Sequence, residues 1–304
     1  MAWAKSRRLL FYALFIAIPV VHYLVFYIYI NFNSILMSLR VYVIEDGALV
    51  YKFAGADNFR QAFQVLRESG RKIGISLLFL AIQLFVNTPL ALVFSYYLYK
   101  KRPGTEFFKV MLFMPQLLSV VVFGFLYQYL TGHVYIAFMD KLFHKEAKNL
   151  LSEISTQLGM MILFNILMSF GVNVLTYTGT MSGINQSLIE SAQLDGCTPV
   201  KEFLHIVVPM TWPTIATLAV VSFAKMFTEQ YNVFTVLGRT PGRADNVGYF
   251  LYTQALDSDV RWNGSPNHYA YPVLSAIGLV LTAIVLPLTL GLRKALDTYG
   301  PRVD

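Results

Sequence analysis

The sequence predicts an all-α integral membrane protein with six transmembrane helices. Of its 304 residues, 56% are hydrophobic and 13% are charged, whereas a water-soluble domain carries about a quarter charged residues. Six apolar stretches reach the roughly 20 residues that a spanning helix needs. None of them alternates with the two-residue period of an outer-membrane barrel. Because lipid satisfies no backbone hydrogen bond, these stretches must form helices.

The six predicted spans follow one another along the whole chain, with basic residues at several of their ends. Lys5, Arg7 and Arg8 precede the first span, and the 100–102 turn follows the second. The first stretch is longer than the apolar region of a signal peptide and shows no small-residue cleavage site, so we interpret it as a retained helix. The predicted spans are residues 9–29, 73–98, 107–130, 158–177, 212–237 and 270–292.

The basic residues predict the orientation of these helices rather than a nucleic-acid partner. The net charge is +7, but the basic residues flank apolar spans, which is typical of membrane topology. Short loops decide the orientation, because long loops cross the membrane largely regardless of their charge. The N-terminal tail, the 100–102 turn and the tail after Leu292 are short, basic and on one side. We therefore expect both termini inside.

A short polar segment between the fourth and fifth spans differs from the rest of the chain. Residues 188–209 read LIESAQLDGCTPVKEFLHIVVP and are helix-prone. Asn185 or Ser187 can cap a first helix there, because their side chains accept hydrogen bonds from free backbone N–H groups. Gly196 permits a sharp turn, and Pro199 suits the first turn of a second short helix. The pattern predicts two short helices joined near the glycine.

Five positions of this segment resemble the EAA loop of ABC-importer permeases. Glu190, Ala192 and Gly196 are followed, after nine residues, by Ile206 and then by Pro209. In that family the loop lies in the cytoplasm and docks the membrane subunit on its ATPase. We also expect Pro209 to interrupt the helix before the fifth span, because proline removes a backbone donor. The alternative interpretation is an amphipathic linker between two membrane helices.

The loop departs from the family pattern at two positions without losing its character. Ser191 replaces the middle alanine by another small residue, and Val208 stands where leucine usually precedes the proline. Asp195 has a second interpretation, as an ordinary residue in the last turn of a helix. The resemblance implies that the loop docks on the ATPase through Glu190, Ala192, Asp195 and Gly196.

The rest of the chain is similar to the six-helix core of maltose-type carbohydrate permeases in type I ABC importers. Segment 53–59 (FAGADNF) resembles a family segment before the second helix, Met114 and Pro115 match a Leu-Pro step, and 238–242 (GRTPG) is a looser glycine-proline turn. The resemblance implies the type I importer permease fold, N-in and C-in, with a cytoplasmic EAA coupling loop. The expected domains are an N-terminal helix with an external loop at 1–72 and a core of five spans at 73–304, which contains the coupling loop at about 185–208.

The resemblance also implies a non-catalytic pore subunit of a multi-chain importer in the bacterial cytoplasmic (inner) membrane. The sequence holds no GxxxxGK[ST] phosphate loop, so we expect ATP and Mg²⁺ on a partner ATPase and no cofactor in this chain. The expected partners are a second homologous permease, two ATPase subunits and an extracellular or periplasmic solute-binding protein. The expected cargo is a sugar or an oligosaccharide.

Polar side chains within the spans are the candidates for the transport path, because ionisable groups cost several kcal/mol in lipid unless they are paired or face water. Lys225 and Glu229 stand four residues apart, so on a helix they either pair with each other or line a cavity. Asn165, Ser169 and Asn173 repeat at the same spacing along the fourth span. Such a stripe lines a cavity or joins neighbouring helices by hydrogen bonds. The residues alone leave these alternatives open.

The family resemblance places seven polar residues from three helices, but not Asn173, at sugar-facing positions. We expect the seven to converge near the bilayer midplane. Lys225 beside Glu229 also admits a charged or amino-substituted glycan. The expected substrate-binding residues are Gln116, Ser119, Asn165, Ser169, Lys225, Glu229 and Gln230.

Two other classes of membrane protein compete with this interpretation. A secondary, ion-coupled transporter requires carboxylates within the spans and usually shows an inverted internal repeat, but only Glu229 stands in mid-span and no repeat is evident. An intramembrane enzyme requires a catalytic group such as a metal-binding His pair, whereas the five histidines are scattered. These observations favour a transport subunit over both alternatives, and the family resemblance implies that it moves sugar and leaves ATP hydrolysis to another chain.

Overall fold

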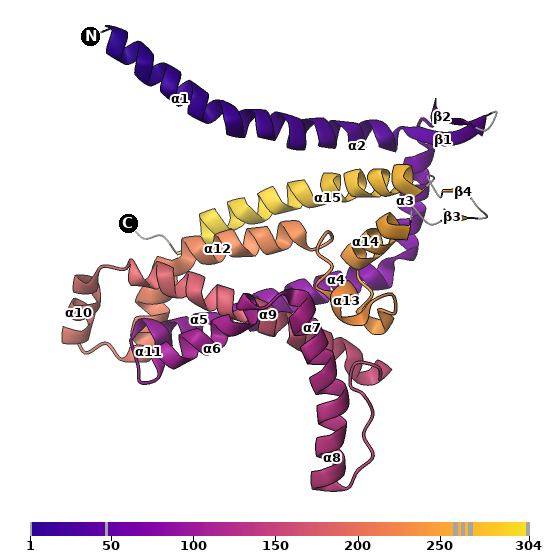
Figure 1. The fold of residues 1–304 in the computed structure, drawn as a ribbon. Coiled ribbons are helices and arrows are strands. Elements are labelled where there is room, and N and C mark those ends of the chain that lie inside the picture. The colour runs from indigo at the N-terminus through magenta and orange to yellow at the C-terminus, as the bar shows by residue number, and fades with distance from the viewer. Residues whose placement is uncertain (1, 46–47, 258–260, 263–264, 267–269, 302–304) are drawn as a thin grey trace. The chain divides into compact units, whose positions relative to one another are not determined.

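The structure, a computed structural model, describes residues 2–45, 48–257, 261–262, 265–266 and 270–301. Within these residues the regular secondary structure is helical apart from two short antiparallel hairpins (Figure 1). Six helical segments of this part of the chain are long and apolar enough to cross a membrane, which confirms the predicted all-α membrane protein with six spans. They are Phe11–Ser38, Gly70–Tyr99, Val120–Phe143, Ile154–Ser182, Pro199–Lys225 and Tyr271–Tyr299.

The chain forms two compact units, Met1–Glu68 with Gln254–Ala283 and Ser69–Thr253 with Ile284–Asp304. In the first unit, α1, a π turn and α2 form one continuous helix, whose side chains are exposed over residues 11–30 as contact with lipid requires. The side chain of Asn58 donates hydrogen bonds to two backbone carbonyls at the start of the hairpin, both at 2.8 Å. The elements are α1 (Ala2–Tyr23), the π turn Leu24–Tyr29, α2 (Ile30–Ser38), β1 (Arg40–Glu45), β2 (Ala48–Phe53), α3 (Asp57–Glu68), β3 (Arg261–Trp262), β4 (Ser265–Pro266) and the first part of α15 (Ala270–Tyr299).

The second unit holds the helices that frame the candidate site. Its long helix α9 packs against α5, α6 and α12. α6 crosses α9 at Gly171, where an added Cβ would collide with the backbone carbonyl of Leu112, so only glycine permits this close approach. The helices are α4 (Gly70–Ile82), α5 (Thr88–Tyr99), α6 (Thr105–Leu117), α7 (Val120–Tyr129), α8 (Tyr135–Phe143), α9 (Ile154–Ser182), α10 (Gln186–Leu194), α11 (Pro199–Glu202), α12 (Val208–Lys225), α13 (Val233–Leu237), the 3₁₀ turn Gly242–Ala244, α14 (Val247–Asp257) and the last part of α15.

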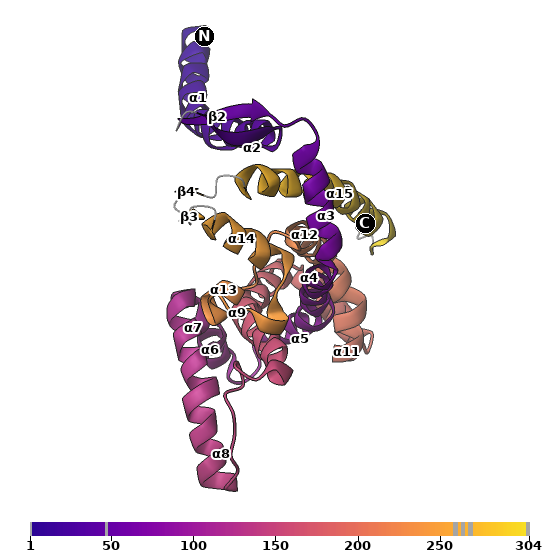
Figure 2. The same cartoon turned by 90° about the vertical axis from the view of Figure 1, so that its right-hand side faces the viewer.

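The third predicted span, 107–130, is wrong in its boundaries. α6 ends early, the backbone at Leu118 is extended (φ −87°, ψ 147°), and α7 begins two residues later. Ser119 caps α7 because its hydroxyl accepts a hydrogen bond from the backbone N–H of Val121 at 3.4 Å, and this local bond competes with continuation of the helix. The third candidate span is therefore Val120–Phe143, in which α7 and α8 form one rod (Figure 2).

The expected interruption at Pro209 is also wrong. The helix continues from α11 into α12 through the π turn Phe203–Val207. In this turn the N–H of Val208 bonds to the carbonyl of Phe203, five residues back. A wider turn accommodates a proline because it relieves the clash of the proline ring with the preceding turn and leaves no obligatory donor missing. The segment Pro199–Lys225 is thus one candidate span.

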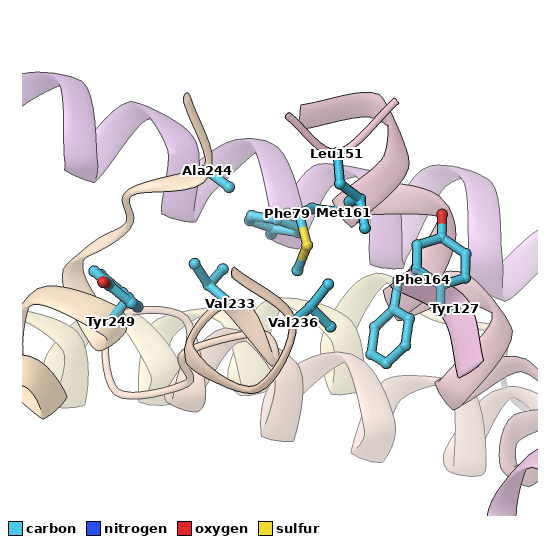
Figure 3. Packing of buried hydrophobic residues seen from close by; sticks show 9 residues of the cluster. All are labelled: Phe79, Tyr127, Leu151, Met161, Phe164, Val233, Val236, Ala244 and Tyr249. Atoms are coloured by element: carbon cyan, nitrogen blue, oxygen red, sulfur yellow. The ribbon is translucent and has the colours of Figure 1, made fainter. Parts of the chain in front are cut away.

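Two buried apolar clusters fix α9 relative to its neighbours. Within lipid such clusters stabilise mainly through close packing, because the lipid around the helices is as apolar as the side chains themselves. The first cluster joins α4, α7, α9 and α13 beside the candidate site (Figure 3) and consists of Phe79, Tyr127, Leu151, Met161, Phe164, Val233, Val236, Ala244 and Tyr249. The second cluster joins α5, α9 and α10 and consists of Ala91, Leu92, Leu98, Val174, Tyr177, Met181, Ile184, Ile189 and Val207.

Candidate functional site

The fifth predicted span does not continue as a helix to residue 237. α12 ends at Lys225, and the chain is irregular until α13 begins at Val233. Within this helix break (residues 226–232), Tyr231 (φ 52°) and Asn232 (φ 56°) adopt the left-handed conformation. That conformation is unusual for residues other than glycine and persists only where surrounding contacts impose it. The prediction of an unbroken helix is therefore wrong.

Side chains from other helices satisfy the backbone of the helix break. Asn165 of α9 donates from Nδ2 to the carbonyl oxygen of Tyr231 at 2.8 Å and accepts at Oδ1 from Asn232 Nδ2 at 3.1 Å. Asn246 donates from Nδ2 to the carbonyl oxygen of Gln230 at 3.2 Å. Irregular backbone at membrane depth occurs only where protein buries it or where it lines a cavity. These bonds satisfy part of the backbone of the helix break from within the protein, and Met226 and Phe227 at its start are buried.

Two close contacts hold the helix break in position. The ring of Tyr231 stacks on Phe79 of α4, with the ring centroids 4.6 Å apart and an interplanar angle of 9°. On another side, α14 approaches so closely that a Cβ added to Gly248 would collide with the backbone carbonyl of Glu229. A glycine at this position is what allows the two backbones to touch.

A polar cavity of about 340 Å³ lies beside the helix break. Its volume falls within the range of small-molecule sites, about 300–1,000 Å³. Most of its polar lining is neutral amide and hydroxyl groups, and one aromatic ring faces it. The lining residues are Gln83, Gln116, Val120, Asn165, Met168, Ser169, Val221, Ser222, Lys225, Glu229, Tyr231 and Asn232.

The structure brings five of the seven predicted site residues into this lining: Gln116, Asn165, Ser169, Lys225 and Glu229. The other two predicted residues lie elsewhere. Ser119 caps α7, and Gln230 is held in the helix break, where its side-chain Oε1 is buried and, among the described residues, has no hydrogen-bond donor. The structure therefore brings five of the seven residues together at one cavity, whereas Ser119 and Gln230 lie outside its lining.

The sequence prediction missed a polar pair in the second span. Gln83 lines the cavity, and the fully buried Asn87 stands behind it in the π turn Gln83–Asn87. The Asn87 amide donates from Nδ2 to Gln83 Oε1 at 2.9 Å and to Ser169 Oγ at 2.8 Å. The sequence does indicate this pair, because Gln83 and Asn87 are polar residues four positions apart within an apolar span, as Asn165 and Ser169 are.

The two charged residues of the cavity do not neutralise each other. In the part of the chain that the structure describes, no ion pair joins Lys225 to Glu229. Both side chains are exposed at the cavity. α12 ends at Lys225, and one further turn, closed by the bond from the Glu229 N–H to the Lys225 carbonyl oxygen at 2.9 Å, does not bring the two charged groups within ion-pair distance. The geometry therefore favours two independent charges over a paired structural contact.

The predicted coupling loop (185–208) has the two-helix form expected from its sequence. Asn185 caps α10 by accepting a hydrogen bond from the N–H of Ser187 at 3.0 Å, which confirms the predicted cap. Gly196 is left-handed (φ +78°), as its proposed turn requires, and Thr198 caps α11, which begins at Pro199. Three of the predicted docking residues, Glu190, Asp195 and Gly196, are exposed, and Ala192 is half-buried.

A polar cavity among membrane-spanning helices, walled by a helix break, is the arrangement that a membrane transport subunit requires. A family model described as "Binding-protein-dependent transport system inner membrane component" matches residues 87–304, and the chain belongs to this family. It is thus a multi-pass protein of the inner membrane. The match confirms the resemblance that the EAA-like loop indicated.

Curated relatives match about two thirds of this chain and of their own length. The arabinooligosaccharides transport system permease protein AraP of Bacillus subtilis is 27% identical over 218 residues, 68% of this chain and 65% of the relative. The sn-glycerol-3-phosphate transport system permease protein UgpA of Yersinia pestis is 25% identical over 201 residues, 64% of this chain and 65% of the relative. The chain therefore matches less than two thirds of the length of either protein.

A solved structure shows the same fold over nearly the whole chain. A chain from the crystal structure of a bacterial ABC transporter involved in the import of the acidic polysaccharide alginate has a TM-score of 0.76 at 19% identity, with 97% of this chain and 98% of that chain covered. A second structure, with an alginate pentasaccharide-bound periplasmic protein, has a TM-score of 0.74 at 19% identity and covers 95% and 94%. At this identity the likeness establishes the fold.

Proposed function

We propose that this chain is the membrane-spanning subunit of an ATP-driven importer for a sugar or an oligosaccharide. The observation that carries the proposal is the polar cavity beside the helix break, in a member of a binding-protein-dependent transport family. A solute-binding protein outside the membrane delivers the cargo, and the cavity receives it on the way across. The expected N-terminal part (1–72) and permease core (73–304) belong to this proposal.

The chemistry of the cavity suits carbohydrate. Amide and hydroxyl groups such as those of Gln83, Gln116 and Ser222 both donate and accept hydrogen bonds, which is what sugar hydroxyls require. The Tyr231 ring supplies an apolar face for the carbon–hydrogen face of a sugar ring. Each hydrogen bond to a neutral hydroxyl contributes about 0.5–1.5 kcal/mol net. Several such contacts together discriminate a sugar from water without binding it irreversibly.

The unpaired charges favour a cargo that carries charge as well as hydroxyl groups. In the described part of the chain, Lys225 and Glu229 line the cavity without an ion pair to each other, and a hydrogen bond to a charged group contributes about 1.5–3 kcal/mol, more than one to a neutral group. The structurally similar transporter is described as importing an acidic polysaccharide. An acidic or amino-substituted glycan is therefore the second candidate, beside a neutral oligosaccharide.

The coupling loop (185–208) supplies the contact with a separate ATPase. Its docking residues Glu190, Asp195 and Gly196 are exposed together with large apolar side chains, of which Leu194 is 88% exposed and Val200 is 67% exposed. Exposed apolar groups beside carboxylates are typical of a surface that a partner covers. With the loop in the cytoplasm, both termini of the chain lie inside, as the basic short loops predict.

A second, homologous permease chain completes the pathway in this proposal. The cavity of one chain is only partly enclosed, and an oligosaccharide needs walls on all sides to cross the membrane. Two ATPase subunits then act on the two coupling loops. An ion-coupled transporter is the alternative, and it needs neither ATPase nor binding protein.

Purification of this chain from its native membrane tests the assembly. We expect a second permease chain and an ATPase to co-purify in constant proportion, because the coupling loop and the open cavity each need a partner. The variant Gly196→Trp is the control, because tryptophan disfavours the left-handed turn of the loop and leaves every membrane-spanning helix unchanged. Purification of the chain without any ATPase, from membranes that contain the wild-type chain, would contradict the proposal.

A transport measurement tests the substrate class. The assembled complex is placed in lipid vesicles and offered an arabino-oligosaccharide, an alginate oligosaccharide and glycerol 3-phosphate as labelled probes. We expect ATP-dependent uptake of at least one of them, with the acidic probes more sensitive to Lys225→Met than the neutral one. Equal loss for all probes would assign Lys225 to the structure of the cavity instead of to its selectivity.

A further inference from the structure

Glu202 differs from the other acidic residues of the coupling loop (185–208) because it points into the protein. Glu190 and Asp195 are exposed, whereas Glu202 is only 2% exposed. A carboxylate is stable in a buried place only when charged or hydrogen-bonding partners replace the lost water. Glu202 is therefore part of the internal framework of the loop and is not available as a docking contact.

Three side chains from neighbouring segments satisfy this carboxylate. Lys100, at the end of α5, forms an ion pair with Oε1, and the Tyr96 hydroxyl of α5 lies 3.1 Å from the same oxygen. Gln193 of α10 donates from Nε2 to Oε2 at 3.1 Å. The Tyr96 hydroxyl also lies 3.1 Å from the carbonyl oxygen of Pro199, where α11 begins. One carboxylate thus joins both short helices of the loop to the end of α5.

These contacts fix the orientation of the coupling loop relative to α5 as well as its distance from α5. The loop also touches the protein through Ile189, which is buried in the second apolar cluster, but apolar contacts have no preferred direction and tolerate sliding. Charge-assisted hydrogen bonds are shorter and stronger than neutral ones and hold a defined geometry. The ring contacts add to this, because Lys100 Nζ lies 5.7 Å from the Tyr96 ring centroid. A displaced loop therefore takes the end of α5 with it.

α5 connects this joint to the cavity. α4, the π turn and α5 form one helical span, Gly70–Tyr99, and Gln83 in its middle lines the cavity. At 1.5 Å per residue, the helix from Gln83 to Lys100 is about 25 Å long. α5 also binds α9 directly, because Ser95 Oγ donates to the carbonyl oxygen of Val174 at 2.9 Å. A movement of the end of α5 is therefore transmitted to two walls of the cavity.

We propose that Glu202 is a positioning residue for energy coupling: with Lys100 it forms the joint through which a push on the loop reaches the second span and the cavity. The proposal rests on the proposed function, since the push comes from an ATPase. Without the joint, the loop still docks but moves relative to α5. ATP hydrolysis and sugar import then lose their fixed proportion.

The variant Glu202→Gln tests the joint, because it keeps the shape of the side chain and removes its charge. In the complete importer in vesicles, with its binding protein and the labelled probe that the wild type imports, we expect the ATP hydrolysed per sugar imported to rise. The expected rise is about two- to thirtyfold, the range over which coupling residues act. Glu106→Gln is the matched control, because Glu106 pairs with Lys109 at 2.8 Å on the exposed surface just beyond the same turn. The control keeps the wild-type ratio.

Two further readouts separate coupling from a merely structural role. The charge swap Lys100→Glu with Glu202→Lys restores the ratio at least in part, because it rebuilds the pair. A spin label on Cys197, the single cysteine, becomes more mobile in Glu202→Gln before the ATPase is added. If Glu202→Gln does not assemble, Lys100→Met with Glu202→Met replaces it, since removal of both charges together is tolerated better than removal of one; the same rise is expected.

A wild-type ATP-to-sugar ratio, together with unchanged mobility of the Cys197 label, would overturn the joint. That result leaves the proposed function intact. By contrast, a wild-type complex that imports none of the probes would overturn the proposed function itself, whatever the variants do.

Discussion

Replacement of Asn165 by alanine is the sharpest test of how the cavity is built. The Asn165 amide makes two hydrogen bonds to the helix break (226–232). Its Nδ2 donates to the Tyr231 carbonyl oxygen at 2.8 Å, and its Oδ1 accepts from Asn232 Nδ2 at 3.1 Å. A third bond, to the carbonyl oxygen of Met161 at 2.8 Å, stays within α9. Because the side-chain donor and acceptor are both used in these bonds, we expect Asn165 to shape the cavity in addition to lining it.

The magnitude follows from the two bonds that cross to the helix break. Each contributes about 0.5–1.5 kcal/mol net, so their loss destabilises the arrangement of residues 226–232 by about 1–3 kcal/mol. That corresponds to a change of about 5–150-fold in the equilibrium between the held and the released helix break. The bond within α9 contributes nothing to this difference, because the α9 backbone is helical in both states.

Hydrogen exchange in lipid nanodiscs measures this equilibrium without any sugar present. We expect the amides of residues 226–232 to exchange faster by about that factor in Asn165→Ala. Asn173→Ala is the matched control: Asn173 stands on the same helix, two repeats further along, and lies outside the cavity lining. Its exchange remains as in the wild type.

Two outcomes would refute this reasoning. Unchanged exchange of residues 226–232 in Asn165→Ala, combined with weaker sugar uptake, would make Asn165 a sugar contact alone. Equally fast exchange of residues 226–232 in Asn173→Ala would show that loss of any side-chain amide on α9 loosens the helix break. The bonds from Asn165 to Tyr231 and Asn232 would then not be what holds it.

Three other changes test separate parts of the site. Gly248→Ala is expected to lower uptake and to destabilise the fold by about 1–3 kcal/mol, because its Cβ would collide with the Glu229 carbonyl; thermal unfolding checks this against Gly74→Ala, where the added Cβ meets nothing within 4 Å, and equal effects would contradict it. Gly196→Leu is expected to abolish substrate-stimulated ATP hydrolysis while the chain stays in the membrane, because leucine resists the left-handed turn at φ +78°; normal stimulation would remove the docking role of the loop. The double change Lys225→Met with Glu229→Gln is expected to alter the range of imported probes at normal assembly, and wild-type uptake of every probe would exclude both residues from the site.

The features that the sequence predicts well depend on residues that are close together along the chain. The number of spans follows from runs of apolar residues, and the cap at Asn185 and the turn at Gly196 follow from side-chain and backbone preferences. These features are present in the structure, although the third and fifth spans have other boundaries than predicted. The EAA-like spacing is equally local, and it identified the family. Such features need no knowledge of which helices meet.

The features that the sequence prediction missed depend on contacts between residues that are far apart along the chain. The helix break after Lys225 requires the amide of Asn165, 66 residues away along the chain, and the close passage of Gly248. The same holds for the buried Glu202, whose partner Lys100 directly follows another span, Gly70–Tyr99. Hydropathy records only how apolar each stretch is, so it joined α12 to α13 across the helix break.

The driving force of transport tests the central claim most directly. Vesicles that contain the purified wild-type complex are loaded with ATP on the side of the coupling loop (185–208), and uptake of the labelled probe is measured with and without ionophores that abolish ion gradients. The account predicts uptake that requires both ATP and the binding protein and is unchanged by ionophores. Uptake that continues without ATP and stops when the ion gradients are abolished would contradict it.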